Sequence, residues 1–165
     1  MSKLIIIRGN SGSGKSTLAG RLQRKFGRNT MVISQDTVRR EMLWAKDGEG
    51  TPALPLMEEL LRYGRRHSEV VILEGILDAR VYERLFETAK EEFGENIFAY
   101  YYDIPFEETV RRHNTRPKAH SFGAEDIKRW WNEKDFLGNI AEEIFTLEIR
   151  LEEAEDLIYN RVAGM

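Results

Sequence analysis

The amino-acid sequence predicts an α/β domain in which a parallel β-sheet lies between layers of helices. Short apolar runs alternate along the chain with longer amphipathic segments, the pattern of parallel strands joined by crossover helices. The first run, Leu4–Arg8, does not alternate apolar and polar residues, which indicates a strand buried on both faces. The length of 165 residues suits one domain. We therefore expect a single domain over residues 1–165.

Local signals place the elements in order. A helix over Lys15–Phe26 ends at Gly27, which is a favoured stop. The helix that Pro105 opens must end before Pro117, because the residue ahead of a proline avoids the helical region. The other expected strands are Met31–Ser34, Val70–Leu73, Ile97–Tyr102 and a short Glu143–Leu147. The other expected helices lie near Thr37–Leu43, from Pro52 or Pro55 to about Arg66, and over Ala79–Phe93, Ala124–Phe136 and Leu151–Val162, with loops at Trp44–Thr51 and Thr115–Gly123.

Composition narrows the function classes. Hydrophobic residues make up 41% and charged residues 32%, which is the composition of a globular protein. The net charge of −3 favours a small substrate over extended duplex nucleic acid. The absence of cysteine excludes disulfides and thiolate chemistry. We expect no membrane partner and a cytoplasmic location, because no apolar run approaches the roughly 18 residues of a membrane span. The oligomeric state stays open.

A phosphate-binding motif follows the first expected strand. Gly9-Asn10-Ser11-Gly12-Ser13-Gly14-Lys15-Ser16 fits G-x-x-x-x-G-K-S/T at every fixed position, between a strand and a helix. This P-loop predicts binding of ATP with Mg²⁺, because its backbone amides suit phosphate oxygens and the Lys15 amine suits the β and γ phosphates. It also makes the fold a three-layer P-loop NTPase fold, with a five-stranded parallel sheet flanked by helices. The expected ATP-binding residues are Gly12, Ser13, Gly14, Lys15, Ser16 and Thr17, with the Ser16 hydroxyl on the metal.

The rest of the chain favours phosphoryl transfer over hydrolysis. Guanine-specific GTPases need N-K-x-D, and Asn132-Glu133-Lys134-Asp135 fails at two positions. Motor ATPases usually place two acidic residues after an apolar strand, whereas Val70–Leu73 is followed by Glu74 and then Gly75. We therefore expect an ATP-dependent kinase that phosphorylates an acceptor hydroxyl.

The acceptor side is expected after the second strand. Asp36 suits the role of base for the acceptor hydroxyl, and Arg39, one helical turn on, suits an acceptor or its phosphate. Asp36 equally suits a helix N-cap and Arg39 a solvated helix surface. Glu74 suits either a metal-bound water or the acceptor, or else a cap of the following turn. Trp44 suits stacking on an acceptor base less well than a half-buried core position, and Trp130 and Trp131 suit helix packing.

A basic lid is expected over about residues 112–123. Arg112 and Arg116 lie four residues apart where a helix opens into a loop, and their guanidinium groups suit charge stabilisation at the γ-phosphate. Closure of such a lid would also exclude water. The alternative is a basic helix C-terminus that interacts with the helix dipole.

Taken together, these segments resemble the P-loop kinases. Gly9–Thr17, Ser34–Arg39, Asp103–Glu108 and Arg112–Arg116 are most similar to the kinase domain of polynucleotide kinase and its small relatives, chloramphenicol phosphotransferase and the zeta toxins. The resemblance implies that Asp36 is the catalytic aspartate, that Arg39 binds an acceptor phosphate and that Arg116 is the lid arginine. These relatives often have two aspartates in a row where this chain has Asp36-Thr37, which leaves the acceptor open.

Two alternatives accompany this interpretation. Leu73-Glu74-Gly75-Ile76-Leu77 resembles the corresponding strand end of uridine kinases, so a nucleoside kinase is the alternative within the same class. The alternative from another class is an ATP-gated binding module with little turnover, in which the arginines sense the nucleotide. The acceptor itself is expected to be a small molecule, a nucleotide or a nucleic-acid end.

Overall fold

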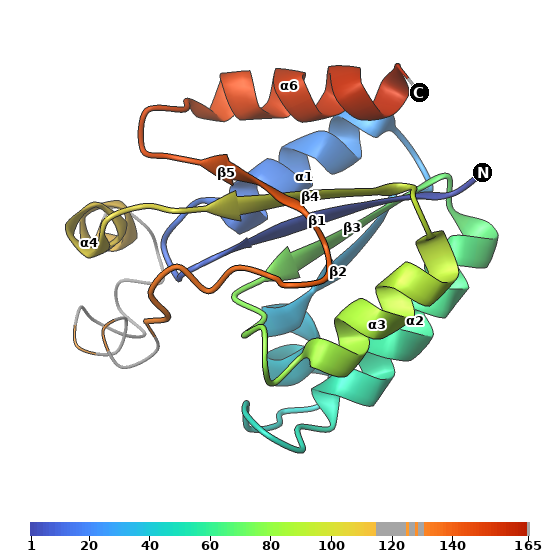
Figure 1. Ribbon diagram of the computed structural model, residues 1–165, viewed down its shortest axis with the longest axis horizontal. Helices are drawn as coiled ribbons and strands as arrows, with labels where there is room; N and C mark the ends of the chain where they lie inside the picture. The colour runs from blue at the N-terminus through green and yellow to red at the C-terminus, as the bar shows by residue number, and fades with distance from the viewer. Residues whose placement is uncertain (115–124, 126–127, 129–130, 165) are drawn as a thin grey trace.

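Five parallel strands form the central sheet (Figure 1). The computed structural model describes residues 1–114, 125, 128 and 131–164. Within them the strand order is β2-β3-β1-β4-β5, so consecutive strands are joined by crossovers and β1 lies at the centre. This confirms the expected α/β fold with a five-stranded parallel sheet. The strands are β1 (Lys3–Gly9), β2 (Met31–Ser34), β3 (Val70–Gly75), β4 (Ile97–Tyr102) and β5 (Glu142–Phe145).

Helices cover both faces of the sheet, as Figure 1 shows. On one face Ile5 and Ile7 of β1 pack in a buried cluster with Leu18 and Ile158. The alternate β1 residues, such as Ile6, face a second cluster on the opposite side. Both faces of β1 are therefore buried, as its unbroken apolar run predicts. Helices α1 (Lys15–Phe26) and α6 (Leu151–Ala163) contribute to the first cluster, and α2 (Ala53–His67) and α3 (Glu83–Phe93) to the second.

Two other helical segments follow strand ends. α4 (Phe106–Asn114) follows β4, and a π-helix, η1 (Thr37–Met42), follows β2. The hydrogen bond from the Leu43 amide to the Val38 carbonyl, 3.1 Å long, spans five residues, as in a π-helix. π-helical turns are rare in proteins, and many of those that occur lie at functional sites. No helix in the described part of the chain is long and apolar enough to span a membrane.

The structure corrects several sequence-based expectations. The helix expected from Ala79 begins at Glu83, because the Asp78 carboxylate accepts hydrogen bonds from the backbone of residues 80 and 81 and forms a turn. The end of the helix expected over Ala124–Phe136 is wrong, since residues 131–136 are not helical. Trp131 packs edge-on against the Phe106 ring from this non-helical segment, and Trp130 lies outside the described residues. The core position expected for Trp44 is wrong, because this side chain is 93% exposed.

Candidate functional site

The phosphate loop forms a turn between β1 and α1 at the carboxyl edge of the sheet. Gly12 and Gly14 have φ of +80° and +100°, in the region that favours glycine, and Gly14 directly precedes α1. A Cβ on Gly12 would lie 2.6 Å from the Thr109 carbonyl oxygen of α4. Gly12 is therefore required both by its backbone conformation and by the close approach of α4. The amides at the start of α1 are available to an anion, as at other helix N-termini.

Lys15 folds back over this loop. Its Nζ donates to the Asn10 carbonyl oxygen at 2.9 Å and to Ser13 Oγ at 3.3 Å, and the side chain is buried. The ammonium group thus lies within the turn formed by residues 10–15. A phosphate in this turn would meet the amine directly.

Ser16 and Glu74 meet at the base of the loop. The Ser16 hydroxyl donates to Glu74 Oε1 at 3.1 Å, and the Glu74 side chain is almost fully buried. The parallel register explains the meeting, because Glu74 of β3 lies beside Ile7 of β1 and Ser34 of β2. A hydroxyl and a carboxylate fit Mg²⁺, which usually binds one or two protein oxygens together with substrate phosphates. Among the described residues no three His, Asp or Glu side chains form a metal cage of their own.

Asp36 follows β2 and faces two arginines. Its Oδ1 lies 3.7 Å from Arg39 Nη2 and 3.7 Å from Arg40 Nε, and its side chain is 50% exposed. Asp36 precedes η1 but makes no capping hydrogen bond, so the N-cap interpretation is wrong. The carboxylate is thus held by ion pairs beside open space rather than by the helix end.

Arg39 is not on a solvated helix surface. Its side chain is only 16% exposed, and its Nη1 donates to the Ala45 carbonyl at 3.3 Å. Its Nε is buried and has no hydrogen-bond partner. An unsatisfied buried donor is costly, and the Arg39 side chain also lines the larger cavity beside it.

Two cavities meet at Asp36. A cavity of about 360 Å³ includes Ser16, Glu74 and Asp36, and a cavity of about 510 Å³ includes Asp36, Arg39 and Asp78. The larger cavity is lined mostly by polar and charged side chains, together with Ile76 and Val81, and it includes Ser11 of the phosphate loop. Asp36 and Arg40 thus line both cavities, and the larger cavity has the size of a small-metabolite site.

Arg112 reaches the phosphate loop from α4. Its Nη1 donates to the Ser13 carbonyl at 2.9 Å and its Nε to Glu108 Oε1 at 3.1 Å. Hydrogen bonds from Arg111 and then Arg112 lower the pKa of Glu108 to about 2, so Glu108 stays ionised and keeps orienting Arg112. The structure thus brings one expected lid arginine to the loop. Arg116 and the rest of the expected lid to residue 123 lie outside the described residues.

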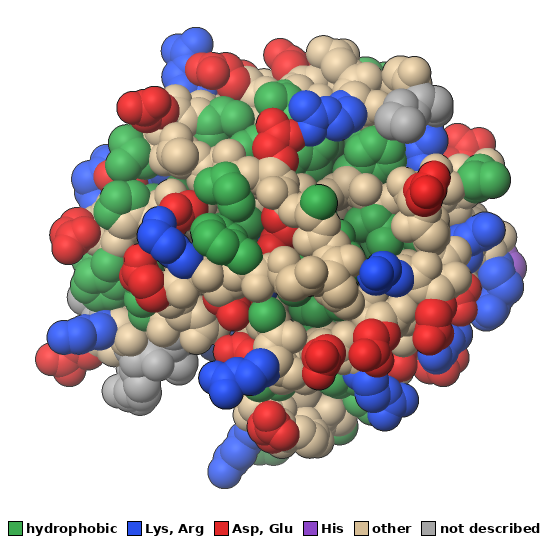
Figure 2. Space-filling view, in the orientation of Figure 1, with side chains coloured by type: hydrophobic (Ala, Val, Ile, Leu, Met, Phe, Trp, Pro, Cys, Tyr) green, Lys and Arg blue, Asp and Glu red, His purple; other side chains and the backbone are tan. Residues whose placement is uncertain are grey.

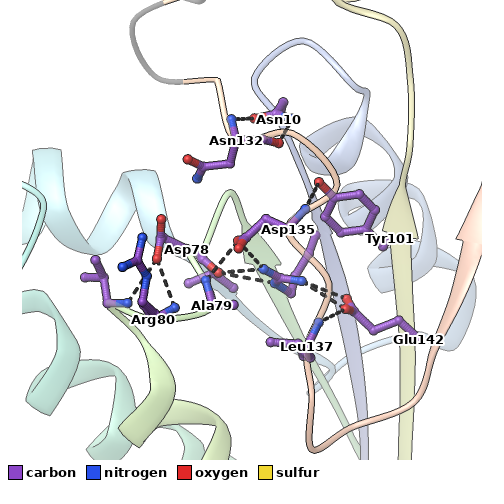
Figure 3. A network of polar contacts seen from close by, with 12 residues as sticks. Asn10, Asp78, Ala79, Arg80, Tyr101, Asn132, Asp135, Leu137 and Glu142 are labelled. Carbon is purple, nitrogen blue, oxygen red and sulfur yellow. Dashed lines mark hydrogen bonds and ion pairs between the residues drawn. The ribbon is translucent and has the colours of Figure 1, made fainter.

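A buried polar network lies next to the site. It was not predicted from the sequence. The guanidinium of Arg8 is fully buried and donates to Glu142, to Asp135 and to the Leu77 carbonyl. Figure 3 shows Asp135 between Ala79 and Tyr101. The Asp135 carboxylate accepts a hydrogen bond from the Ala79 amide at 2.9 Å, and the Asp135 amide donates to the Tyr101 hydroxyl at 3.1 Å. A lone arginine in an otherwise apolar strand was the available signal, because a buried charge requires partners.

Asn10 joins the phosphate loop to the segment after the expected lid. Its side-chain amide donates to the Asn132 carbonyl and accepts from the Asn132 amide, both at 2.7 Å (Figure 3). This pair of bonds fixes residue 132 against the loop. Asn132 and Asp135 had entered the sequence interpretation only as part of a failed guanine motif.

The charge on the described surface is mixed. Figure 2 shows acidic and basic side chains interspersed over the face drawn there. A broad basic surface is the usual footprint of duplex binding, and the described residues of this face do not form one.

The fold and the phosphate loop define the chain as a P-loop protein with the fold of the P-loop kinases. The model of a protein family described as an AAA domain matches residues 4–131. The chain belongs to this family. The resemblance to P-loop kinases that the sequence suggests is thereby confirmed.

Solved structures show the same fold. A gluconokinase from Sinorhizobium meliloti 1021 is 15% identical with a TM-score of 0.71, and the match covers 98% of this chain and 92% of that one. The APS kinase of Mycobacterium tuberculosis, in complex with AMPPNP and APS, is 19% identical with a TM-score of 0.67 and coverages of 99% and 98%. The Pnkp1/Rnl/Hen1 RNA repair complex contains a chain that is 23% identical, with a TM-score of 0.57 and coverages of 78% and 42%. A comparison with curated protein sequences gave no match.

Proposed function

We propose that this protein is an ATP-dependent phosphotransferase that moves the γ-phosphoryl group of ATP·Mg²⁺ to a hydroxyl of a small acceptor. The observation that carries the proposal is the position of Asp36, which lines both the cavity beside Ser16 and Glu74 and the larger polar cavity. A phosphoryl donor on one side and an acceptor on the other would meet at this carboxylate. The gluconokinase and the APS kinase of the same fold are kinases by name, which supports the proposal.

The donor side follows from the phosphate loop. The amides of residues 12–17 would bind the phosphates, and Lys15 would turn from the Asn10 carbonyl to the β and γ phosphates. Ser16 would bind the metal through its hydroxyl, with Glu74 beside it, directly or through a water molecule. Bound Mg²⁺ would neutralise charge on the phosphates. Arg112 and, from the expected lid, Arg116 would stabilise the charge that develops on the transferred group.

In the proposed transfer step, Asp36 acts as the base. Its carboxylate accepts the proton of the acceptor hydroxyl as the acceptor oxygen bonds to the γ-phosphorus. The bond from the γ-phosphorus to the oxygen that bridges it to the β-phosphate breaks, and ADP leaves. Arg39, which lines the larger cavity beside Asp36, would bind an anionic part of the acceptor. We therefore propose a hydroxylated acceptor that carries a phosphate, sulfate or carboxylate group.

Release of ADP from ATP and Mg²⁺ tests the proposal. Parallel reactions would contain gluconate, shikimate, APS, uridine or an oligonucleotide with a 5′-hydroxyl. One acceptor class should stimulate release, and Lys15→Ala should abolish the stimulation. Asp36→Asn should lower turnover by about a hundredfold while nucleotide binding, followed by calorimetry, stays nearly intact.

Asp156→Asn is the matched control, because Asp156 is an exposed α6 residue whose ion pair with Lys25 lies on the surface. Unchanged turnover in Asp36→Asn would remove Asp36 from the mechanism. Stimulation by uridine alone would favour the nucleoside kinase. Slow release with every acceptor, together with retained ATP binding, would favour the ATP-gated binding module.

A further inference from the structure

The loop between η1 and α2 forms one wall of the larger cavity. Lys46, Asp47 and Gly48 line this cavity from residues 44–51. Gly48 and Gly50 have φ of +105° and +76°, so the loop turns sharply at both positions. Bonds within the loop, from Thr51 to the carbonyls of residues 46 and 48, shape it but do not connect it to the sheet.

Asp47 connects the loop to the opposite wall. The Tyr82 hydroxyl donates to Asp47 Oδ1 at 2.6 Å, and Gln35 Nε2 donates to Asp47 Oδ2 at 3.1 Å. Gln35 Nε2 also lies 3.0 Å from the Tyr82 hydroxyl oxygen, so the three side chains form a closed triangle. Each oxygen of the carboxylate thus has its own donor.

The two donors are fixed by the core. Tyr82 is fully buried, and Gln35 is buried with its Oε1 accepting the Leu77 amide at 2.9 Å. A Cβ on Gly75 would lie 2.5 Å from Gln35 Oε1, so the missing side chain leaves space for the amide. Asp47 is the exposed member and comes from a loop, whereas both of its partners are buried.

The Tyr82 phenol remains a hydrogen-bond donor near neutral pH. Burial, together with the hydrogen bond to Asp47, raises the pKa of the Tyr82 phenol above its ordinary value. Tyr82 therefore keeps its proton and stays a donor. Loss of the Tyr82 hydroxyl would leave Asp47 Oδ1 without its donor, and a change of one carboxylate oxygen to an NH₂ group would place two donors against each other.

We propose that Asp47, Tyr82 and Gln35 form a latch that holds the loop over residues 44–51 against the acceptor cavity and so sets acceptor affinity. The inference rests on the proposed kinase function for the identity of that cavity. Tyr82 and Gln35 also line the cavity, and their hydrogen bonds to Asp47 make them positioning residues for the loop. The held loop places Lys46 in the lining of the cavity that Arg39 and Arg40 also line, which suits the anionic group proposed for the acceptor.

Hydrogen–deuterium exchange of the loop tests the latch without an acceptor. In Tyr82→Phe and in Asp47→Asn, the amides of residues 45–50 should exchange about tenfold faster than in the parent protein, the effect of losing one charge-assisted hydrogen bond. Thr88→Val is the matched control, because it removes another buried hydrogen bond, 2.9 Å long, between Thr88 of α3 and Glu58 of α2. Exchange of the loop at the parent rate in both latch variants would overturn the proposal.

Steady-state kinetics test the link to the acceptor. With whichever member of the panel stimulates ADP release, both latch variants should raise the acceptor KM about tenfold and leave the ATP KM within about threefold. Thr88→Val should change neither KM. Faster loop exchange with an unchanged acceptor KM would overturn the role in acceptor binding. If no acceptor is phosphorylated, the kinase proposal fails, while the exchange rates still decide whether the latch exists.

Discussion

Replacement of Arg8 by methionine measures how much the buried network contributes to stability. The substitution keeps most of the apolar stem and removes the guanidinium, which is fully buried. That group donates twice to Glu142 at 3.0 Å, once to Asp135 at 2.8 Å and twice to the Leu77 carbonyl at 3.2 and 3.0 Å. The perturbation therefore breaks an ion-pair network without changing the shape of the strand.

The magnitude follows from the burial of the partners. The Glu142 side chain is only 3% exposed, so Arg8→Met leaves an uncompensated carboxylate in the core. Removing one partner of a buried pair typically costs about 3–5 kcal/mol. Glu142 keeps the Leu137 amide at 2.7 Å and Asp135 keeps the Ala79 amide at 2.9 Å, which places the expected loss at about 3–4 kcal/mol.

Urea denaturation followed by far-ultraviolet circular dichroism provides the assay. Arg150→Met is the control, because this side chain is 79% exposed and its partner Glu153 is 55% exposed, which predicts a loss of about 0–1 kcal/mol. The double variant Arg8→Met/Glu142→Met should recover part of the loss, since an apolar replacement of a buried pair is often tolerated. A loss below about 1 kcal/mol in Arg8→Met, or a double variant that is less stable than the single one, would refute the reasoning.

Two further predictions concern the metal and alkaline pH. Glu74→Gln should raise the Mg²⁺ concentration for half-maximal activity by about tenfold to a hundredfold, as loss of a group beside a metal ligand does; an unchanged Mg²⁺ titration would assign Glu74 elsewhere. Burial raises the pKa of Tyr82, Tyr100, Tyr101 and Tyr102, the last to about 12 from 10.0. The unfolded chain therefore loses these protons first, so the free energy of unfolding should fall as pH rises from about 10 to about 12. Urea midpoints that stay constant over that range would contradict this sign.

The sheet and the phosphate loop were predictable because their signals are local. The bounds of α1, β2 and β4 agree with the expected ranges, since an apolar run flanked by turn residues or a helix followed by glycine is complete within a few residues. The meeting of Ser16 with Glu74 also follows from local motifs once parallel strands place their ends together. The right-handed crossover rule leaves few other arrangements.

Two of the errors have their cause in local hydrogen bonds, one made by a side chain and one by the backbone. The Asp78 carboxylate caps the backbone of residues 80 and 81 and delays α3, although the apolar periodicity begins earlier. Trp44 is exposed because η1 ends with the Ala45 amide bonded to the Arg39 carbonyl, which gives residue 44 a φ of +49°. Neither of these hydrogen bonds produces a periodic pattern of residues that could be recognised in the sequence.

The buried network around Arg8 could not be predicted from local sequence patterns, because its contacts join distant parts of the chain. Arg8 meets Asp135 and Glu142, 127 and 134 residues further on. Asp135 in turn accepts a hydrogen bond from the Ala79 amide, so one carboxylate links the strand before the phosphate loop to the turn beside the larger cavity. Phosphoryl transfer depends on alignment of donor and acceptor, in which a displacement of about 1 Å is costly. A charged network that is expensive to distort therefore suits the place where both halves of the proposed site are anchored.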